Sequence, residues 1–200
     1  IIVGGAAFNQ EIEAFLRKIN FPYTVGYGMT ECGPIISYED WTRFKAGSCG
    51  KAAPRMEVKI LSADPQNIPG EIVTRGDNVM LGYYKNEEAT NEVLKNGWLF
   101  TGDMAREDED GFLYLVDRKK DVVISGGENL YPVQIEDYIR GFDKIKDVAV
   151  IGLPHARLGE IAAAIVEIKE DMTCTEEEIN TFCMGLPRYK RPRKIIFDKI

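Results

Sequence analysis

The stretch YTVGYGMTE, residues 23–31, holds a predicted strand, Tyr23 to Tyr27, that runs into a polar loop. The order of residue types puts an aromatic ring, a hydroxyl and a carboxylate at the end of that strand, on Tyr27, Thr30 and Glu31. These groups suit stacking on a base, a hydrogen bond to an oxyanion and ligation of Mg²⁺. Taken alone, the same residues also fit an ordinary polar loop.

The residues upstream of this stretch predict a strand–turn–helix unit of α/β type. Ile1 to Val3 forms a short apolar strand that enters the turn Gly4-Gly5-Ala6-Ala7. A helix is expected from about Asn9 to Ile19, because apolar residues recur there at the spacing of one helix face: Ile12, Phe15, Leu16 and Ile19. A glycine turn between a strand and a helix suits a bound phosphate, but it also suits tight packing alone.

Downstream, the pattern changes to short β segments between Gly47 and Val116, separated by Gly, Pro, Asn and Asp. That spacing predicts a small antiparallel barrel or sandwich with almost no helix. One strand, beginning at Trp98, is predicted to end in a carboxylate at Asp103. Such a carboxylate can accept both hydroxyls of a ribose, although an aspartate after glycine also occurs in plain β-turns.

A charged run, DRKKD at residues 117–121, is the predicted domain boundary, with residues 1–117 on one side and 118–200 on the other. The second part has the pattern of a compact α+β domain. Its expected elements are a helix with Pro132 at its first position, strands at Val148 to Leu153 and Ile161 to Ile168, a helix with a capping box at Thr175, and a strand from Lys194.

Composition narrows the functional classes. The 200 residues are 44% hydrophobic and 28% charged, which is typical of a globular chain. A net charge of −7 argues against nucleic acid as a partner, because phosphate binding needs clustered Lys and Arg. Four scattered cysteines and a single histidine argue against structural zinc.

The apolar stretches are too short for a membrane span, so we expect a soluble, cytoplasmic protein. Because the chain does not begin with Met and ends within a predicted strand, we expect a piece of a longer protein.

Several motifs occur in one order along the chain: YGMTE at 27–31, GEI at 70–72, GYY at 82–84, TGD at 101–103, DRKKD at 117–121 and SGGENLYP at 125–132. In this order the chain resembles the acyl-adenylate-forming family of AMP-dependent synthetases and ligases, and within it the fatty-acid acyl-CoA synthetases. The resemblance implies an α/β and α+β architecture. The end of a large adenylating domain, an α/β unit plus a small β-barrel, would be followed by a small mobile C-terminal domain, with a hinge near 117–121.

The resemblance also implies roles for individual residues. Tyr27 would stack on the adenine of ATP. The residues that would line the same pocket are Gly4, Gly5, Ala6 and Gly28. Asp103 and Arg118 would bind the ribose.

Four further positions carry over from the family. Thr30 would hydrogen-bond the α-phosphate and the attacking carboxylate, and Glu31 would hold Mg²⁺. Lys120 occupies the hinge position, about which the small domain would rotate between two half-reactions. Gly126 and Gly127 would line the tunnel for the pantetheine arm of coenzyme A, because glycines let the backbone approach a thin ligand closely.

The implied activity is that of an ATP-dependent acid–CoA ligase. It would activate a carboxylic acid, a fatty acid as the first expectation, to an acyl-AMP with release of pyrophosphate, and then form a thioester with coenzyme A. Two alternatives stay open: transfer to the phosphopantetheine of a carrier protein, and a non-catalytic module that binds a nucleotide or CoA. Peripheral membrane contact is compatible with the sequence.

Two parts of the family pattern have no counterpart here. The Gly/Ser/Thr-rich phosphate loop of the family precedes the matched region, and its catalytic lysine would follow Ile200. We therefore expect these 200 residues alone to be inactive.

Overall fold

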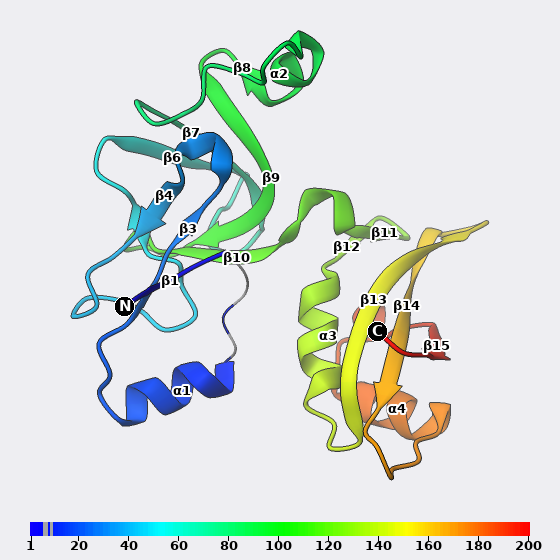
Figure 1. Ribbon diagram of the computed structural model, residues 1–200. Coiled ribbons are helices and arrows are strands. Elements are labelled where there is room, and N and C mark those ends of the chain that lie inside the picture. The colour runs from blue at the N-terminus through cyan, green and yellow to red at the C-terminus, as the bar shows by residue number, and fades with distance from the viewer. Residues whose placement is uncertain (6–7, 9) are drawn as a thin grey trace. The chain divides into compact units, whose positions relative to one another are not determined.

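The computed structural model describes residues 1–5, 8 and 10–200 (Figure 1). It divides into two compact units, Ile1–Leu115 and Val116–Ile200. The predicted helix start at Asn9, and the turn residues Ala6 and Ala7, lie outside the described residues. Within the described ranges, no helix has the length and hydropathy needed to cross a membrane.

The first unit begins with a strand and a helix in the predicted order. Strand β1 (Ile2–Val3) pairs in parallel with β2 (Thr24–Val25), and α1 (Gln10–Lys18) lies between them in the chain. The predicted strand from Tyr23 to Tyr27 is divided at Gly26, because β3 (Tyr27–Gly28) leaves β2 and pairs antiparallel with β4 (Ile35–Tyr38). The chain thus changes sheet immediately before Tyr27.

Two sheets form the β region of this unit (Figure 1). One has three strands, β3, β4 and β5 (Lys51–Ala52). The other has five: β6 (Met56–Leu61), β7 (Gly70–Gly76), β8 (Leu94–Lys95), β9 (Trp98–Glu107) and β10 (Leu113–Arg118). Buried side chains from both sheets pack in one core, including Tyr27 and Ile36 from the first and Ile72 and Leu99 from the second. This is the shared core expected of a small barrel or sandwich.

Two details differ from the sequence prediction. Strand β9 does not end at Asp103 but continues to Glu107. A helix that the apolar pattern did not predict, α2 (Glu87–Val93), lies in the β region. Its residues are mostly polar and none is buried, so its signal is the cap: the side chain of Asn86 accepts a hydrogen bond of 3.1 Å from the amide of Ala89.

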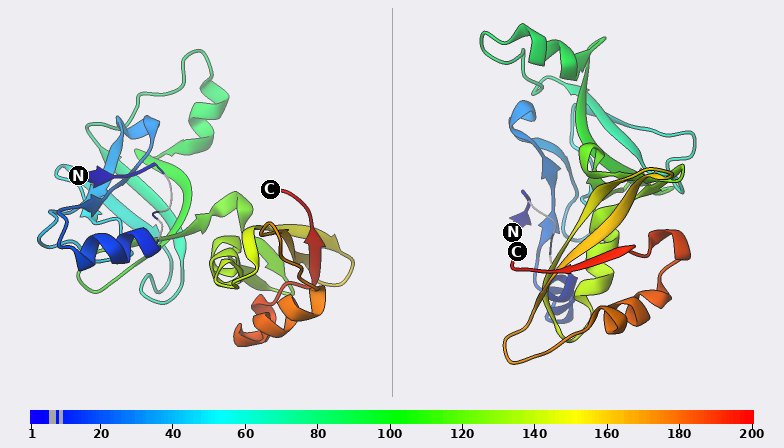
Figure 2. Two further views of the ribbon diagram at one scale, coloured as in Figure 1. Left: turned by 60° about the horizontal axis from the view of Figure 1, so that its bottom comes forward. Right: turned by 90° about the vertical axis from the view of Figure 1, so that its right-hand side faces the viewer.

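The second unit is a five-stranded sheet with two helices on one face (Figure 2, left). Its strands are β11 (Val123–Ser125), β12 (Glu128–Leu130), β13 (Ile145–His155), β14 (Gly159–Ile168) and β15 (Lys194–Phe197). The helices are α3 (Pro132–Arg140) and α4 (Glu176–Phe182), and their buried residues Ile135, Ile139 and Ile179 share one core with the sheet.

The local signals in this unit predicted both helices and the strands β13, β14 and β15, but not β11 and β12. Pro132 stands at the start of α3, and Thr175 forms the capping box of α4 with Glu178. The alternating residues of β13 and β14 explain why both helices lie on the same face. Val148 pairs with Val166 and Val150 with Ala164, and all four are buried.

Candidate active site

The first relationship in the site joins two strands far apart in sequence. The hydroxyl of Tyr27, on β3, donates a hydrogen bond of 2.6 Å to Oδ2 of Asp103, on β9. Tyr27 is only 7% exposed. Burial first, and then the hydrogen bond to Asp103, raise the pKa of its phenol far above the usual value. The phenol therefore stays protonated and remains a donor to the carboxylate.

A β-bulge aims Asp103. The pairing of β7 with β9 shifts register between Glu71 and Val73, opposite the Thr101-Gly102-Asp103 segment. Gly102 has a φ of +75°, which favours glycine. A bulge of this kind redirects a side chain without ending the strand. The prediction that a strand ends at Asp103 is therefore wrong, because Asp103 lies at a bulge within β9 and the strand continues beyond it.

The GEI motif holds this bulge in place. The amide of Gly102 donates to Oε1 of the buried Glu71 at 3.2 Å, and the hydroxyl of Thr101 donates to the carbonyl of Ile72 at 2.9 Å. The amide of Asp103 in turn donates to Oγ1 of Thr101 at 3.1 Å. Two motifs that are separate in the sequence, GEI and TGD, thus form one structural element.

Two of the predicted glycines, Gly4 and Gly28, lie next to the backbone around Tyr27. Gly4 follows β1 and lies beside Gly26, so closely that a Cβ on Gly4 would come within 3.0 Å of the Gly26 carbonyl oxygen. Gly5 follows it with a φ of +92°. At Gly28, a Cβ would lie 1.9 Å from the carbonyl oxygen of Pro34, so only glycine fits there. The remaining predicted pocket residue, Ala6, lies outside the described residues.

Thr30 and Glu31 lie in a short 3₁₀ turn, Thr30–Cys32, directly after β3. Thr30 is exposed and Glu31 is partly exposed. Oε1 of Glu31 accepts a hydrogen bond of 2.8 Å from the hydroxyl of Tyr83, and the Glu31 carbonyl accepts one of 2.7 Å from the amide of Met80. Tyr83 belongs to the GYY motif, for which the sequence predicted no role.

A single carboxylate is a chemically reasonable Mg²⁺ ligand in this setting. Among the described residues, no group of three or more His, Cys, Asp and Glu side chains is arranged to hold a metal ion. Mg²⁺ in nucleotide-dependent enzymes is usually held by one or two carboxylates together with substrate phosphates and water. Glu31 fits that arrangement, since its Oε2 has no hydrogen bond to another protein group described here.

The predicted ribose and hinge residues of the second unit are accessible. Arg118 is the last residue of β10, and Lys120 lies in a 3₁₀ turn, Lys119–Asp121; both side chains are exposed. Asp117, near the end of β10, has a structural role that the sequence did not predict. Oδ2 of Asp117 accepts a hydrogen bond of 3.0 Å from the amide of Val133, in the first turn of α3. Tyr131, the N-cap residue of α3, has no side-chain cap, so Asp117 caps the helix from a distance.

Gly126 and Gly127 form the turn of the β11–β12 hairpin. Ser125 pairs with Glu128 across them, and their φ values are +62° and +88°. Two left-handed residues are what a tight two-residue hairpin requires, and glycine adopts that backbone without strain. Both glycines are exposed, and the amide of Gly126 donates to the carbonyl of Leu158 at 2.8 Å. The tip is therefore accessible but anchored.

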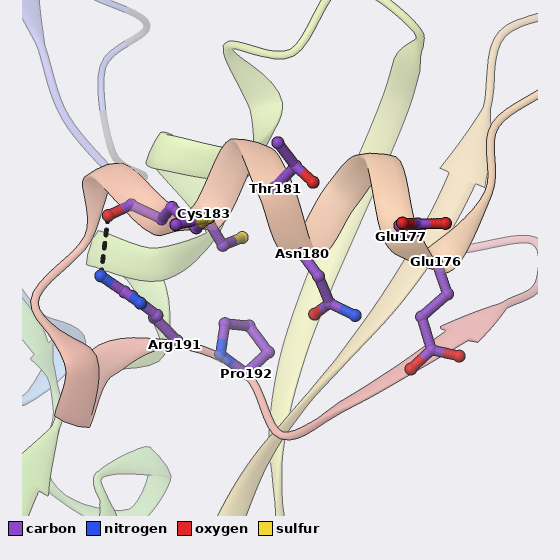
Figure 3. A pocket seen from close by; sticks show the side chains of 8 residues that line it. Glu176, Glu177, Asn180, Thr181, Cys183, Arg191 and Pro192 are labelled. Atoms are coloured by element: carbon purple, nitrogen blue, oxygen red, sulfur yellow. Dashed lines mark hydrogen bonds between the residues drawn. The ribbon is translucent and has the colours of Figure 1, made fainter.

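A separate hollow of about 630 Å³ lies on the second unit, beside α4 (Figure 3). Its lining residues are Glu176, Glu177, Asn180, Thr181, Cys183, Met184, Arg191 and Pro192. The guanidinium of Arg191 is engaged in donating to the carbonyls of Leu186 and Met184. None of the predicted site residues lines this hollow.

Comparison with known protein families identifies both units. Residues 1–84 match the family described as AMP-binding enzyme, and residues 134–199 match the AMP-binding enzyme C-terminal domain. Together the two matches cover most of the chain, in the expected order. The chain therefore belongs to the AMP-binding enzyme family.

Curated relatives narrow the comparison. The chain is 40% identical over 201 residues to a long-chain-fatty-acid–CoA ligase of Escherichia coli O157:H7, with 97% of the chain and 36% of the relative covered. It is 42% identical over 178 residues to the enzyme of the same description from Yersinia pestis, with 86% of the chain and 32% of the relative covered. The chain thus spans about a third of the length of these relatives.

Solved structures of similar proteins support the fold. The o-succinylbenzoate CoA synthetase of Bacillus subtilis, in complex with its acyl-adenylate intermediate, matches with a TM-score of 0.90 and 32% identity over 99% of this chain and 42% of that one. The ATP-bound MatB of Rhodopseudomonas palustris matches with a TM-score of 0.86 and 31% identity over 98% and 41%. The architecture expected from the motifs, part of an adenylating domain followed by a small α+β domain, is confirmed.

Proposed function

We propose that this chain is part of an AMP-forming acid–CoA ligase whose acid is a fatty acid. The observation that carries the proposal is the hydrogen bond from Tyr27 to Asp103, because it joins a candidate for adenine stacking to a candidate for ribose binding. Adenine and ribose are adjacent in ATP, so their protein partners must be adjacent as well. The relatives named long-chain-fatty-acid–CoA ligases, at 40% identity or more, support the choice of acid.

The first half-reaction joins two anions. An oxygen of the acid attacks the α-phosphorus of ATP, the bond to the bridging oxygen breaks, and pyrophosphate leaves. Thr30 donates a hydrogen bond where negative charge develops, and Glu31 would hold Mg²⁺. When bound, Mg²⁺ offsets the charge of the phosphate oxygens. Tyr27 and Asp103 orient the nucleoside, and Arg118 is the further candidate for ribose binding.

The second half-reaction uses the small domain, residues 118–200. The thiol of coenzyme A attacks the acyl carbonyl, gives up its proton, and AMP leaves as the thioester forms. The large domain ends at residue 117. Lys120 is the hinge about which the small domain rotates between the two half-reactions. Gly126 and Gly127, at the exposed tip of the hairpin, lie along the pantetheine arm, where the absence of Cβ atoms leaves room for it.

We place the reaction in the cytoplasm. Coenzyme A is the proposed acceptor of the acyl group. Peripheral contact with a membrane would supply fatty acids, which partition into lipid. The two alternatives predict other outcomes with the same substrates: transfer to a carrier protein gives a thioester on that carrier, and binding without turnover gives no product.

The deciding experiment is a panel of carboxylic acids assayed for pyrophosphate release by the complete protein. Each acid is tested with ATP and Mg²⁺, and the acyl product is then chased with coenzyme A or with a phosphopantetheinylated carrier protein. We expect pyrophosphate release with long-chain acids and a thioester with coenzyme A. Release of pyrophosphate followed by transfer only to the carrier protein would overturn the assignment of coenzyme A as the acceptor. Absence of pyrophosphate with every acid would overturn the ligase activity itself.

A further inference from the structure

The GYY motif contains two adjacent tyrosines in different settings. The hydroxyl of Tyr83 donates to Oε1 of Glu31 at 2.8 Å across 52 positions of sequence. The neighbouring Tyr84 is 88% exposed, and its ring lies under the ammonium of Lys85, 5.2 Å from the ring centroid. Of the two tyrosines, Tyr83 is therefore the one whose hydroxyl contacts the predicted Mg²⁺ ligand Glu31.

The backbone around Tyr83 is held by α2. The amide of Tyr83 donates to Oγ1 of Thr90 at 2.9 Å, and that hydroxyl donates to the carbonyl of Asn86 at 2.8 Å. Gly82 passes so close to this helix that a Cβ would lie 2.9 Å from Cγ2 of Thr90, and its φ is +149°. Helix α2, none of whose residues is buried, thus fixes the position from which Tyr83 reaches Glu31.

A second contact fixes the other side of the pair. The amide of Met80 donates to the backbone carbonyl of Glu31 at 2.7 Å. The segment from Met80 to Tyr83 therefore holds Glu31 by its backbone and by its side chain. The Tyr83 hydroxyl occupies Oε1, and within the described part of the chain Oε2 accepts no hydrogen bond, so it is available to a cation. A carboxylate held by such a bond loses less rotational freedom when it binds a metal.

We propose that Tyr83 is a positioning residue: its hydroxyl orients the carboxylate of Glu31 so that this carboxylate can bind Mg²⁺. This inference rests on the proposed function, in which Glu31 is the metal ligand. It gives the GYY motif a role: Gly82 permits the approach to α2, and Tyr83 carries the hydroxyl. Hydrogen-bond partners of metal ligands typically contribute tenfold to hundredfold to metal affinity.

The test measures metal binding directly in the complete protein. Mn²⁺ replaces Mg²⁺, and the free ion is followed by electron paramagnetic resonance in a titration with ATP present. Tyr83→Phe keeps the ring and removes only the hydroxyl, and Tyr84→Phe is the matched control on the next residue. We expect Tyr83→Phe to weaken Mn²⁺ binding roughly tenfold and Tyr84→Phe to leave it within about twofold of the parent.

Glu31→Ala separates this inference from the proposed function on which it rests. We expect Glu31→Ala to weaken Mn²⁺ binding at least as much as Tyr83→Phe, and the double variant to be no weaker than Glu31→Ala alone. If Glu31→Ala weakens binding and Tyr83→Phe does not, the positioning role of Tyr83 is wrong while the metal site stands. If Glu31→Ala has no effect, the assignment of Glu31 is wrong and the inference falls with it.

Discussion

The hydroxyl of Tyr27 donates a hydrogen bond of 2.6 Å to Asp103, which joins the start of β3 to the bulge of β9. The ring of Tyr27 belongs to the core that the two sheets share, and Asp103 follows a bulge tied to Glu71 and Ile72. The proposed nucleoside site is therefore built into the core of the first unit.

The first prediction concerns Tyr27→Phe in the complete enzyme. The ring and its stacking surface remain, but Asp103 loses its donor. A hydrogen bond to a charged group contributes about 1.5 to 3 kcal/mol, and water can replace part of it, so we expect kcat/KM for ATP to fall roughly 5- to 30-fold. The KM for the acid should change by less than about twofold. An unchanged kcat/KM for ATP would mean that this bond does not position the ribose-binding group.

The second prediction concerns Asp103→Ala, which removes the carboxylate itself. Loss of two charge-assisted bonds to ribose hydroxyls should cost about 2 to 4 kcal/mol, or roughly 30- to 1000-fold in the use of ATP. Asp103→Asn keeps an acceptor for Tyr27 and should fall between the parent and Asp103→Ala. Steady-state kinetics with ATP as the varied substrate measure both. Parental kinetics in Asp103→Ala would exclude the ribose role.

The two variants should also interact. Tyr27→Phe added to Asp103→Ala should have almost no further effect on ATP use, because the hydroxyl then has no carboxylate to hold. Additive losses would show that Tyr27 acts on the nucleotide independently of Asp103.

Local signals explain what could be predicted from the sequence. The start of α3 follows from Pro132, and the start of α4 follows from the capping box of Thr175 with Glu178, because each signal acts within one helical turn. The order of motifs likewise indicated an adenylating domain followed by a smaller one. These features depend on neighbouring residues or on motif order, both of which a single sequence contains.

Partners at long range explain what could not be predicted. The bulge at Gly102 depends on the register of β9 against β7, which no local pattern specifies. The pairs Tyr27–Asp103 and Glu31–Tyr83 are separated by 76 and 52 positions. Helix α2 escaped prediction because a short polar helix without a buried residue has no apolar period.

The third prediction uses the pH dependence of Asp117. Burial raises the pKa of this carboxyl above its usual range, although the amides of Val133 and Arg118 oppose the shift. Because the folded pKa lies above the unfolded value of about 3.9, the stability that Asp117 contributes is fully present below that value. It is lost as pH rises through the folded pKa. Relative to the parent, Asp117→Asn should therefore gain stability as pH rises above about 4.

Urea unfolding of the 200-residue chain, followed by circular dichroism, measures this difference at each pH. Glu178→Gln is the control of opposite sign. The hydrogen bond from Lys144 lowers the pKa of Glu178, so the stability that Glu178 contributes is present above the usual carboxylate pKa and is lost as pH falls through the folded value. Relative to the parent, Glu178→Gln should therefore lose stability as pH rises. Parallel trends in the two variants would contradict the burial of Asp117.

The fourth prediction concerns Gly127→Ala at the hairpin tip. A Cβ there would meet no atom within 4 Å, but a φ of +88° strains any other residue by about 1 to 2 kcal/mol. We expect the thioester step to slow severalfold while formation of acyl-AMP stays within about twofold of the parent. Gly97→Ala is the matched control, because Gly97 also has an open Cβ position and a φ of +78°.

Both alanine variants should lose similar stability, and only Gly127→Ala should lose thioester formation. The two half-reactions are measured separately, as pyrophosphate release without coenzyme A and as consumption of supplied acyl-AMP with it. If Gly97→Ala slows the thioester step equally, the effect comes from general strain, and Gly127 has no special place beside the pantetheine arm.

The fifth prediction tests Lys120 as a hinge. Its side chain is exposed in the 3₁₀ turn Lys119–Asp121, so Lys120→Ala should leave both half-reactions within about twofold of the parent. Lys120→Pro fixes φ near −65° and removes an amide donor. A backbone that must rotate between two domain positions would then be held in one of them. We therefore expect Lys120→Pro to slow one half-reaction at least tenfold more than the other, whereas simple destabilisation would lower both together. Rapid-quench measurement of acyl-AMP formation, beside thioester formation from supplied acyl-AMP, separates the two cases, and equal losses would remove Lys120 from the hinge.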